Sequence, residues 1–325
     1  MKSSNPRGQI IVVGTSEYGG LRNSIVSALS SLGRNVEAVD VPVWRPARFE
    51  SFAIRAPRLA FGYRRRLLRD IDRFVSGGVI DLVLVVKGSY LDAHTIDQFR
   101  SRLSAPVVCW NPDSPFDKAI SNRGGGIPAA IGAYDGYVTW ADDVAERLAS
   151  RNSHVIVIPF AWDPMLHRPT AGSGVAEGRI VLVGTGSRYR SELVREIVHL
   201  RPVVFGNRWP SIDGVEFHSP IFGTQMSAVV GEAKWNLNFL HPQNALSHNM
   251  RTFEIPGSGG NQVADRTKDH ERFLGSDSRT LLFDSHAELE SILRSDPVEL
   301  TQRRPDLLAM HTYIERVSLL LREPW

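Results

Sequence analysis

The chain has 325 residues, about two domains' worth, and its 42% hydrophobic and 22% charged content is ordinary for a globular protein with a full core. The formal net charge is only +3, and we expect no nucleic-acid partner. The single cysteine, Cys109, excludes an internal disulfide, and no apolar stretch reaches the roughly 18 residues that a membrane span needs. We therefore expect a cytoplasmic protein.

From Gln9 onward, short apolar runs alternate with amphipathic segments. In the first half this pattern predicts strands at 10–13, 36–41, 82–86, 107–110, 136–139 and 155–158, with helices at 21–32, 93–103 and 141–149. Short apolar runs between helices are typical of a parallel sheet covered on both faces. The next segment, 159–178, has three prolines, three glycines and few apolar residues, which indicates a linker.

The segment 55–73 is basic and amphipathic. Its arginines are interleaved with apolar residues: Arg55, Arg58, Arg64, Arg65, Arg66, Arg69 and Arg73. A helix here is either a solvated face whose apolar side packs on a sheet, or a surface for an anionic membrane or a polyanionic acceptor. Asp70 and Asp72 look like a metal-binding D-x-D, but helical residues two apart point about 200° away from each other and cannot share an ion.

The second half repeats the alternation. Predicted strands lie at 180–183, 203–205, 235–239, 262–264 and 280–283, predicted helices at 191–200, 224–233, 251–256 and 287–293, and an apolar stripe predicts a last helix from 305 to 321. The sequence thus predicts an α/β protein with two Rossmann-like halves. In doubly wound sheets ligands collect at the carboxyl ends of the strands, so we expect the site there.

The most informative stretch is 247–265. A cation, Arg251, and a carboxylate, Glu254, precede a turn that we expect to approach a phosphate or sugar: Gly257, Ser258, Gly259 and Gly260. Arginine clamps phosphate, a carboxylate accepts the hydroxyls of a ribose, and glycines let backbone N–H groups come close to a ligand. This combination suits a nucleotide sugar. The alternative is a glycine C-cap that ends an ordinary helix.

Two further groups are candidates for donor binding. The turn after the strand at 180–183 offers Gly184 and Thr185, and Arg190 just beyond it is a second phosphate clamp. The loop that follows the strand at 235–239 is dense in side chains that suit a sugar or uracil ring: Asn238, His241, Asn244, His248 and Asn249. A metal site is the weaker interpretation, because no cysteine or carboxylate completes a set of ligands.

On the other half, Asp113 directly follows the strand at 107–110. A carboxylate there is placed to act as a general base or to orient an acceptor hydroxyl. A turn-forming aspartate between prolines is an equal alternative. Glu17 and Arg22, beside two glycines, are weaker candidates for an acceptor loop.

The stretch 247–265 resembles the nucleotide-binding motif of group 1 glycosyltransferases, and within them of CgeB-like, spore-maturation-type proteins. Segments similar to that family also occur at 81–88, 107–115, 155–169, 181–190, 203–209 and 311–316. The resemblance assigns Glu254 to the ribose of the donor. One departure is Leu246, which stands where retaining family 4 enzymes carry a second glutamate, so their donor-sugar contact and stereochemical outcome cannot be transferred.

The resemblance implies the GT-B architecture, in which two Rossmann-like domains face each other across a cleft and a C-terminal helix crosses back to the first domain. It places an acceptor-binding domain at 1–163, a nucleotide-sugar-binding domain at 164–304 and the crossing helix at 305–325. The donor would be a nucleotide-diphosphate sugar and the acceptor a glycan, a lipid-linked molecule or a protein.

We therefore expect a metal-independent glycosyltransferase without a cofactor, with Asp113 and Arg251 as its catalytic residues. Peripheral contact with the inner membrane face is a further expectation from the basic segment. Two alternatives stay open at this point: a catalytically inactive nucleotide- or sugar-binding protein on the same scaffold, and a nucleotide-sugar epimerase.

Overall fold

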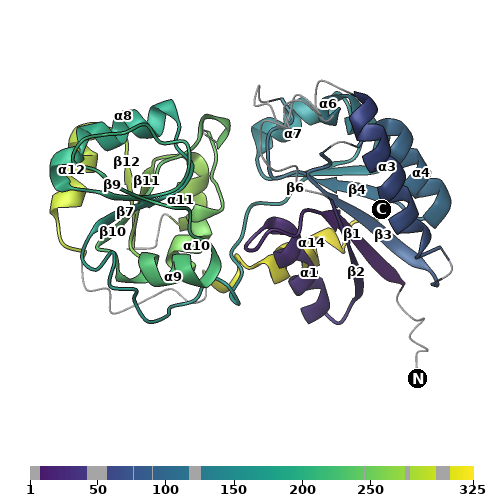
Figure 1. The fold of residues 1–325 in the computed structure, drawn as a ribbon, viewed down its shortest axis with the longest axis horizontal. Coiled ribbons are helices and arrows are strands. Elements are labelled where there is room, and N and C mark those ends of the chain that lie inside the picture. The colour runs from purple at the N-terminus through teal and green to yellow at the C-terminus, as the bar shows by residue number, and fades with distance from the viewer. Residues whose placement is uncertain are drawn as a thin grey trace. The chain divides into compact units, whose positions relative to one another are not determined.

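The computed structural model describes residues 8–41, 57–75, 77–89, 91–116, 126–244, 246–274, 279–297 and 308–325. The chain forms two compact units: the first comprises Met1–Pro159 with Arg316–Trp325, and the second comprises Phe160–Glu315. Each unit has one parallel sheet with helices on both faces (Figure 1).

The first unit has a six-stranded sheet in the order β2-β1-β3-β4-β5-β6, with all neighbours parallel. Its strands are β1 (Gln9–Gly14), β2 (Asn35–Asp40), β3 (Ile80–Val86), β4 (Val107–Trp110), β5 (Gly136–Thr139) and β6 (Val155–Val157). Its helices are α1 (Leu21–Ser31), α3 (Pro57–Asp72), α4 (Ala93–Leu103), α6 (Ile127–Ala130), α7 (Asp142–Ala149) and most of α14 (Tyr313–Leu320). Helices α1 and α14 lie on one face of this sheet and α3 and α4 on the other (Figure 1).

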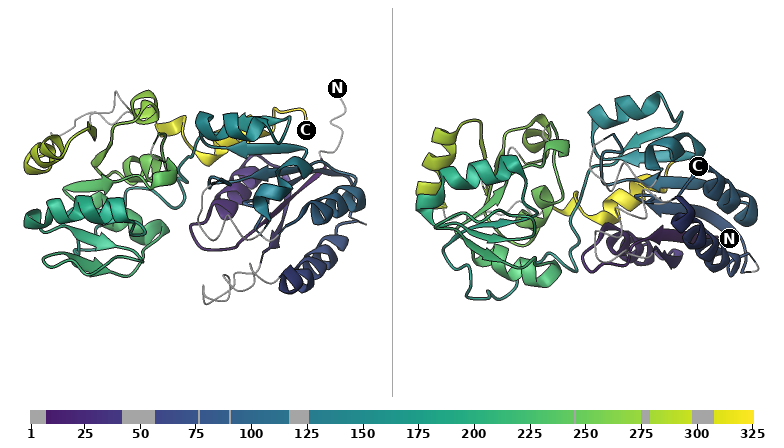
Figure 2. Two further views of the ribbon diagram at one scale, coloured as in Figure 1. Left: turned by 90° about the horizontal axis from the view of Figure 1, so that it is seen from above. Right: turned by 45° about the horizontal axis from the view of Figure 1, so that its top comes forward.

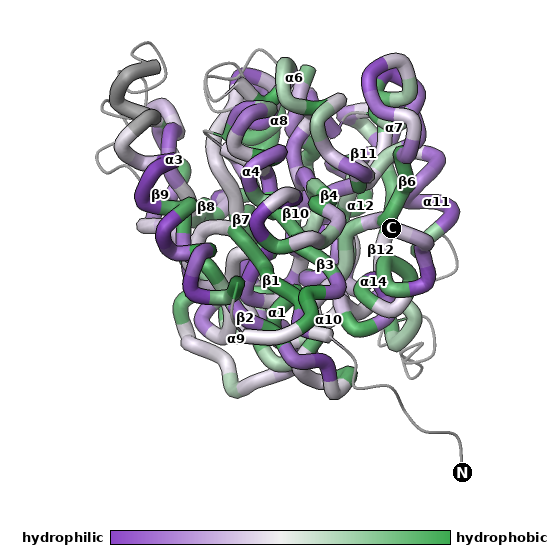
Figure 3. Tube along the Cα trace, turned by 90° about the vertical axis from the view of Figure 1, so that its right-hand side faces the viewer, coloured by the Kyte–Doolittle hydropathy of each residue, from purple (hydrophilic) through white to green (hydrophobic). Residues whose placement is uncertain are grey.

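The inner strands β1, β3 and β4 of the first unit are largely apolar because helices cover both faces, whereas the edge strand β2 is mostly exposed. Every residue of β4 and β5 is buried, and Ile10–Val13 in β1 are fully inaccessible. Figure 3 shows β1 and β3 as hydrophobic segments. Such continuous apolar runs explain why the predicted strands at 107–110 and 136–139 coincide with β4 and β5.

The second unit has a six-stranded parallel sheet in the order β12-β11-β10-β7-β8-β9. Its strands are β7 (Ile180–Val183), β8 (Val203–Phe205), β9 (Glu216–His218), β10 (Trp235–Asn238), β11 (Gln262–Asp265) and β12 (Thr280–Phe283). Its helices are α8 (Arg188–Glu196), α9 (Gly223–Glu232), α10 (Arg251–Gly257), α11 (Lys268–Leu274) and α12 (His286–Arg294). Short 3-10 turns lie at Ile131–Ala133 in the first unit and at Val198–Leu200 and Pro242–Asn244 in the second.

Alternate side chains of the second sheet build two separate cores. Leu182 and Val204 pack with α8 and α12, whereas the neighbouring Val181 and Val203 pack with α9 and with Ile255 of α10. This alternation fixes the register of the strands, because a slip by one residue would exchange the two cores. The carboxyl ends of β7 and β10 are thereby held side by side.

The sequence missed two elements, and two of its predicted helices have different bounds in the structure. The short edge strand β9 and the largely polar helix α11 lack an apolar run and were not predicted. The helix predicted at 191–200 begins earlier, at Arg188, because the hydroxyl of Ser187 accepts the Arg190 N–H at the helix start. The last helix, predicted from 305, is α14 from Tyr313; the predicted part at 305–307 lies outside the described residues, as does Arg55.

The end of the chain returns to the first unit, as expected from the sequence (Figure 2). The Nε–H of Arg316 donates to the Pro159 carbonyl at 3.0 Å. The ring of Trp325 lies against Gly136, where a Cβ atom would collide with it, and 4.6 Å from the ring of His154. Within the described part of the chain, no helix is both long and apolar enough to cross a membrane.

Candidate functional site

Two arginines cross at the switch point of the second sheet, between β7 and β10, where the strand order reverses. Arg190, from α8 after β7, donates its Nε–H to the carbonyl of Phe239 just past β10 and another N–H to the carbonyl of Thr185, both at 2.7 Å. Arg251, from α10 after β10, donates its Nε–H to the carbonyl of Val183 in β7 at 3.2 Å. Each guanidinium is thus anchored by the strand that precedes the other arginine.

The arginine pair concentrates positive charge at the carboxyl edge of the sheet. Burial, followed by the charge of Arg251, lowers the pKa of Arg190 to about 10, so Arg190 is still cationic at neutral pH. The Asp265 carboxylate opposes this shift, but its oxygens accept hydrogen bonds from the Tyr189 hydroxyl and from the Leu240 N–H. Two anchored guanidinium groups at a switch point have the charge that an anion such as a diphosphate requires, which makes this pair the candidate phosphate site.

Glu254 lies directly behind this pair. Its carboxylate is buried, with the side chain 2% exposed, and one oxygen forms an ion pair with Arg251. The other oxygen faces the Nε2 of His167 at 3.7 Å. His167 Nδ1 accepts the Asp163 N–H at 3.4 Å, which leaves the proton on Nε2, toward Glu254. Burial lowers the pKa of His167, so the ring is neutral at pH 7.

Sequence reasoning did not identify His167, because it comes from the linker between the two sheets. Its side chain is buried, and neither its spacing nor its neighbours distinguish it in the sequence. Leu246, at the position of the second family glutamate, is 76% exposed.

The glycine turn after α10 has the geometry of a helix C-cap. The N–H groups of Ser258, Gly259 and Gly260 donate to the carbonyls of Glu254, Pro256 and Ile255. The Ser258 hydroxyl contacts that of Ser227 at 3.0 Å. These three backbone N–H groups are therefore used to end helix α10. This is the glycine C-cap that the sequence analysis gave as the alternative to a ligand-binding turn. Gly257 is required for packing, because a Cβ there would lie 2.5 Å from the Trp162 ring.

The turn after β7 is held by close backbone packing. The Gly184 N–H donates to the Phe205 carbonyl at 2.9 Å, and its carbonyl accepts the indole N–H of Trp209 at 2.9 Å. A Cβ on Gly206, after β8, would collide with the Gly184 carbonyl, and one on Gly186 would lie 2.5 Å from the Arg208 carbonyl. Glycine is needed at these positions because two turns meet there, and their rigid contact fixes the chain leading to Arg190.

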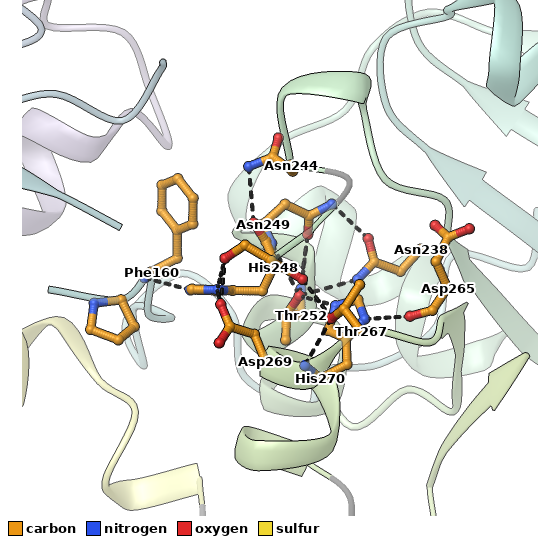
Figure 4. A network of polar contacts seen from close by, with 12 residues as sticks. Phe160, Asn238, Asn244, His248, Asn249, Thr252, Asp265, Thr267, Asp269 and His270 are labelled. Atoms are coloured by element: carbon orange, nitrogen blue, oxygen red, sulfur yellow. Dashed lines mark hydrogen bonds and ion pairs between the residues drawn. The ribbon is translucent and has the colours of Figure 1, made fainter. Parts of the chain in front are cut away.

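The polar loop after β10 forms a buried network (Figure 4). The Asn238 amide donates to Gln262 at 3.0 Å, and its oxygen accepts from the Asn249 amide at 2.8 Å. Asn249 in turn accepts the Thr252 N–H at 3.1 Å, and the hydroxyl of Thr252 contacts Nε2 of His270 at 2.8 Å. Asn238 and Asn249 are thus tied into the protein, where they orient the start of α10.

His248 lies in the same network and anchors the linker (Figure 4). The ring is fully buried; its Nε2 accepts the Phe160 N–H at 3.1 Å, and its Nδ1 lies 2.9 Å from Asp269. Because Nε2 is the acceptor, Nδ1 carries the proton and donates to the carboxylate. The hydroxyl of Ser247 also donates to Asp269. Asp269 and His270 come from α11, which the sequence pattern did not predict.

On the first unit, Asp113 follows β4 and pairs with Lys87, which follows β3. The Lys87 Nζ lies 2.6 Å from the Asp113 carboxylate, and both side chains are partly exposed. A turn does form here, but its side-chain acceptor is Asn111, which accepts the Asp113 N–H at 3.0 Å, rather than Asp113 itself. Arg22 pairs with Asp40 at 2.5 Å. Asp113 lies in the first unit, and the residues predicted to bind the donor lie in the second.

Asp70 and Asp72 have separate partners. Asp70 pairs with Arg73 at 3.1 Å and Asp72 with Arg102 at 2.6 Å, as expected for helix residues two apart. Among the described residues, no three His, Cys, Asp or Glu side chains gather as a metal-ligand group.

Comparisons with known proteins agree with this architecture. Residues 188–322 match the family model described as "Glycosyl transferase-like". A comparison with curated proteins finds no match. Three solved structures are similar across the whole chain: UDP-GlcNAc 2-epimerase from Methanocaldococcus jannaschii in complex with UDP-GlcNAc and UDP, the lipopolysaccharide outer core galactosyltransferase WaaB, and α,α-trehalose 6-phosphate synthase from Burkholderia multivorans.

The three structures have 12%, 10% and 11% sequence identity and TM-scores of 0.52, 0.56 and 0.62, respectively. Each alignment covers 97% of this chain, and it covers 99%, 98% and 98% of the other chain. At this identity the likeness concerns the fold. The chain has the two-domain α/β fold called GT-B, with a glycosyltransferase-like second half.

Proposed function

We propose that this protein is a glycosyltransferase that moves a sugar from a nucleoside-diphosphate sugar to an acceptor hydroxyl. The observation that carries the proposal is the crossed pair of Arg190 and Arg251 at the switch point of the second sheet. The "Glycosyl transferase-like" match over the same half supports it. The second unit binds the donor, and the first unit, with Asp113, binds the acceptor.

In the proposed reaction the acceptor oxygen forms a bond to the anomeric carbon and gives its proton to the Asp113 carboxylate. The bond from the anomeric carbon to the phosphate oxygen breaks, and its electron pair leaves with the nucleoside diphosphate. Arg190 and Arg251 stabilise the charge that develops on this leaving group, and stabilisation of developing charge is usually the largest single contribution to catalysis.

The nucleoside is proposed to be uridine, since the M. jannaschii epimerase with this fold was solved with UDP-GlcNAc and UDP. The ribose is assigned to Glu254, whose ion pair with Arg251 links ribose recognition to the phosphate clamp. Replacing Glu254 by glutamine should weaken the binding of both uridine and UDP in calorimetry. Unchanged uridine affinity would mean that the Glu254 carboxylate does not bind the ribose and serves only as the ion-pair partner of Arg251.

The decisive experiment measures UDP release from UDP-glucose, UDP-galactose and UDP-GlcNAc, with glycan, lipid-linked and protein acceptors and without any acceptor. Transfer requires UDP release that depends on an acceptor. Because the arginines already supply the positive charge, we expect EDTA to leave the rate unchanged. Loss of activity in EDTA and recovery with Mg²⁺ or Mn²⁺ would contradict the proposed metal independence.

The likeness to the M. jannaschii epimerase favours one second candidate, a nucleotide-sugar epimerase. An epimerase would convert UDP-GlcNAc into an isomer without an acceptor, which nuclear magnetic resonance of the sugar detects. UDP binding without isomerisation or transfer would instead identify a catalytically inactive binding protein.

The proposal includes a peripheral membrane contact through helix α3. Helix α3 buries Tyr63, Leu67 and Ile71 and exposes Arg65, Arg66 and Arg69. Exposed arginines attract anionic lipid, with about 1 kcal/mol for each residue near the surface. Sedimentation with phosphatidylserine vesicles at low and high salt tests this contact, and equal recovery with neutral vesicles would contradict it.

A further inference from the structure

Lys87 has an unusual backbone conformation at the end of β3. Its φ is +68°, in the left-handed region that residues other than glycine rarely adopt. The Gly88 N–H donates to the Val86 carbonyl at 2.9 Å, so Lys87 is the central residue of a γ-turn with positive φ, which is the rare and strained form. A glycine at this position would adopt the turn without strain.

The surroundings hold this strained turn in place. The Lys87 N–H donates to the Trp110 carbonyl at 2.9 Å, which ties the turn to β4. Beneath the next residue, Gly88, lies the Tyr134 hydroxyl, which a Cβ there would approach to 2.6 Å. The chain therefore has little freedom at this point. Strained residues that their surroundings over-determine cluster at functional sites.

The location agrees with a functional role. The first sheet has the order β2-β1-β3-β4, so its strand order reverses between β1 and β3, and Lys87 follows β3 at its carboxyl end. Ligands of doubly wound sheets bind at this point. The turn directs the ammonium group to 2.6 Å from the Asp113 carboxylate, and both side chains are about a quarter to a third exposed, at 30% and 26%. The Lys87–Asp113 ion pair is therefore fixed in position by the turn and still accessible to a ligand.

We propose that Lys87 is the positioning residue of the acceptor site: it orients the Asp113 carboxylate toward an acceptor hydroxyl. The inference rests on the proposed transfer reaction. The strained turn places the cation beside the carboxylate, and the ion pair holds the carboxylate in one orientation. An arginine at position 87 keeps the charge, whereas glycine keeps the turn and loses the cation.

The test compares Lys87→Gly, Lys87→Met and Lys87→Arg in the full-length protein, with UDP release from the donor panel above as the readout. Lys87→Gly should lower kcat by about 100-fold or more, the range for a general base that no longer functions. The donor KM and the affinity for UDP should stay within about twofold, because Lys87 lies in the first unit. Lys87→Met should behave as Lys87→Gly does, and Lys87→Arg should recover most of kcat.

A matched control is Lys234→Met, which removes the lysine of another Lys–Asp pair, at 2.8 Å from Asp296 in the second unit. It should leave kcat unchanged. Lys87→Gly should melt no lower than this control, because glycine relieves the strain. Full activity of Lys87→Gly, or a lower melting temperature than the control, would mean that the residue serves only the fold and would overturn the inference. If the wild-type protein releases no UDP from any donor, the proposed function itself fails and this inference with it.

Discussion

At the scale of single residues, the arginine pair gives the sharpest prediction. Arg190→Ala and Arg251→Ala should each weaken UDP binding by about 1–3 kcal/mol, the range for losing a charged hydrogen bond, and Arg190→Ala, which leaves the partner of Glu254 in place, should not change uridine binding. Calorimetry with the two ligands separates phosphate recognition from base recognition. Arg188→Ala is the control, since this arginine is 93% exposed in the same helix and pairs with Glu192. Equal losses for UDP and uridine would place the diphosphate elsewhere.

Sequence reasoning reached part of this site. Arg190 and Arg251 are candidates because arginine binds phosphate, and the resemblance to group 1 glycosyltransferases assigned Glu254 to the ribose. The burial of Glu254 between Arg251 and His167 depends on where the linker packs, and local sequence does not specify that. Lys87 was missed for a different reason: its positive φ is imposed by tertiary packing, and lysine carries no signal for such a turn.

At the scale of elements, alanine substitutions at two glycines test different effects: a steric clash at Gly206 and backbone entropy at Gly62. Gly206→Ala places a Cβ against the Gly184 carbonyl, so it should separate the turns after β7 and β8, lower the melting temperature and weaken UDP binding. Gly62 lies in α3, where an added Cβ would meet no neighbouring atom within 4 Å, and Gly62→Ala should be neutral or stabilise by about 0.5–1 kcal/mol. Thermal unfolding of both variants, with UDP titration, checks this pair. Wild-type affinity in Gly206→Ala would show that the turns move independently.

The buried His270 of helix α11 predicts how the stability of the protein depends on pH. Burial lowers the pKa of His270 to about 4, against about 6.5 in the unfolded chain. The folded state therefore binds fewer protons than the unfolded state between these values, and stability is present above pH 6.5 and lost as the pH falls. Urea unfolding should show a loss of about 2–3 kcal/mol between pH 7 and pH 4.5, since each pH unit costs about 1.4 kcal/mol per proton.

The variant that tests this assignment is His270→Gln, which removes the titrating ring. It is expected to be less stable at pH 7, because the ring accepts from Thr252 and donates to the Asp265 carbonyl. Its stability should change less between pH 7 and pH 4.5 than that of the wild type. Parallel curves for the two proteins would assign the acid sensitivity to other groups, among which buried His167 also has a lowered pKa.

The elements also show what the sequence could specify about the fold. Strands buried on both faces, such as β4 and β5, were located to the residue because each is a short, fully buried and mainly apolar run between amphipathic segments. The edge strand β9 pairs on one side only and has an exposed glutamate and a histidine, so its three residues resemble a loop. Helix α11 owes its position to the buried contacts of His270 and Phe273, which become visible only in the folded chain.

At the scale of the whole molecule, the end of the chain should stabilise the first unit without affecting donor binding. Trp325→Ala removes the ring that covers Gly136 and stacks near His154, and should cost about 1–2 kcal/mol for a partly buried aromatic side chain. Unfolding should start at lower denaturant, while the affinity for UDP stays at the wild-type value. Trp325→Phe should restore most of the stability. A loss of UDP affinity in Trp325→Ala would mean that UDP binding by the second unit depends on the first unit.

The division of the chain has a consequence for its synthesis. The second unit, Phe160–Glu315, is inserted into the first, whose final piece is Arg316–Trp325. A ribosome therefore delivers every residue of the second unit before the first unit is complete, although translation of the first began earlier. The second unit therefore has its whole sequence before the first unit does, and Gly136 stays uncovered until residues 316–325 arrive. A released chain that ends at Glu315 should protect its second unit from protease, whereas its N-terminal half should remain sensitive.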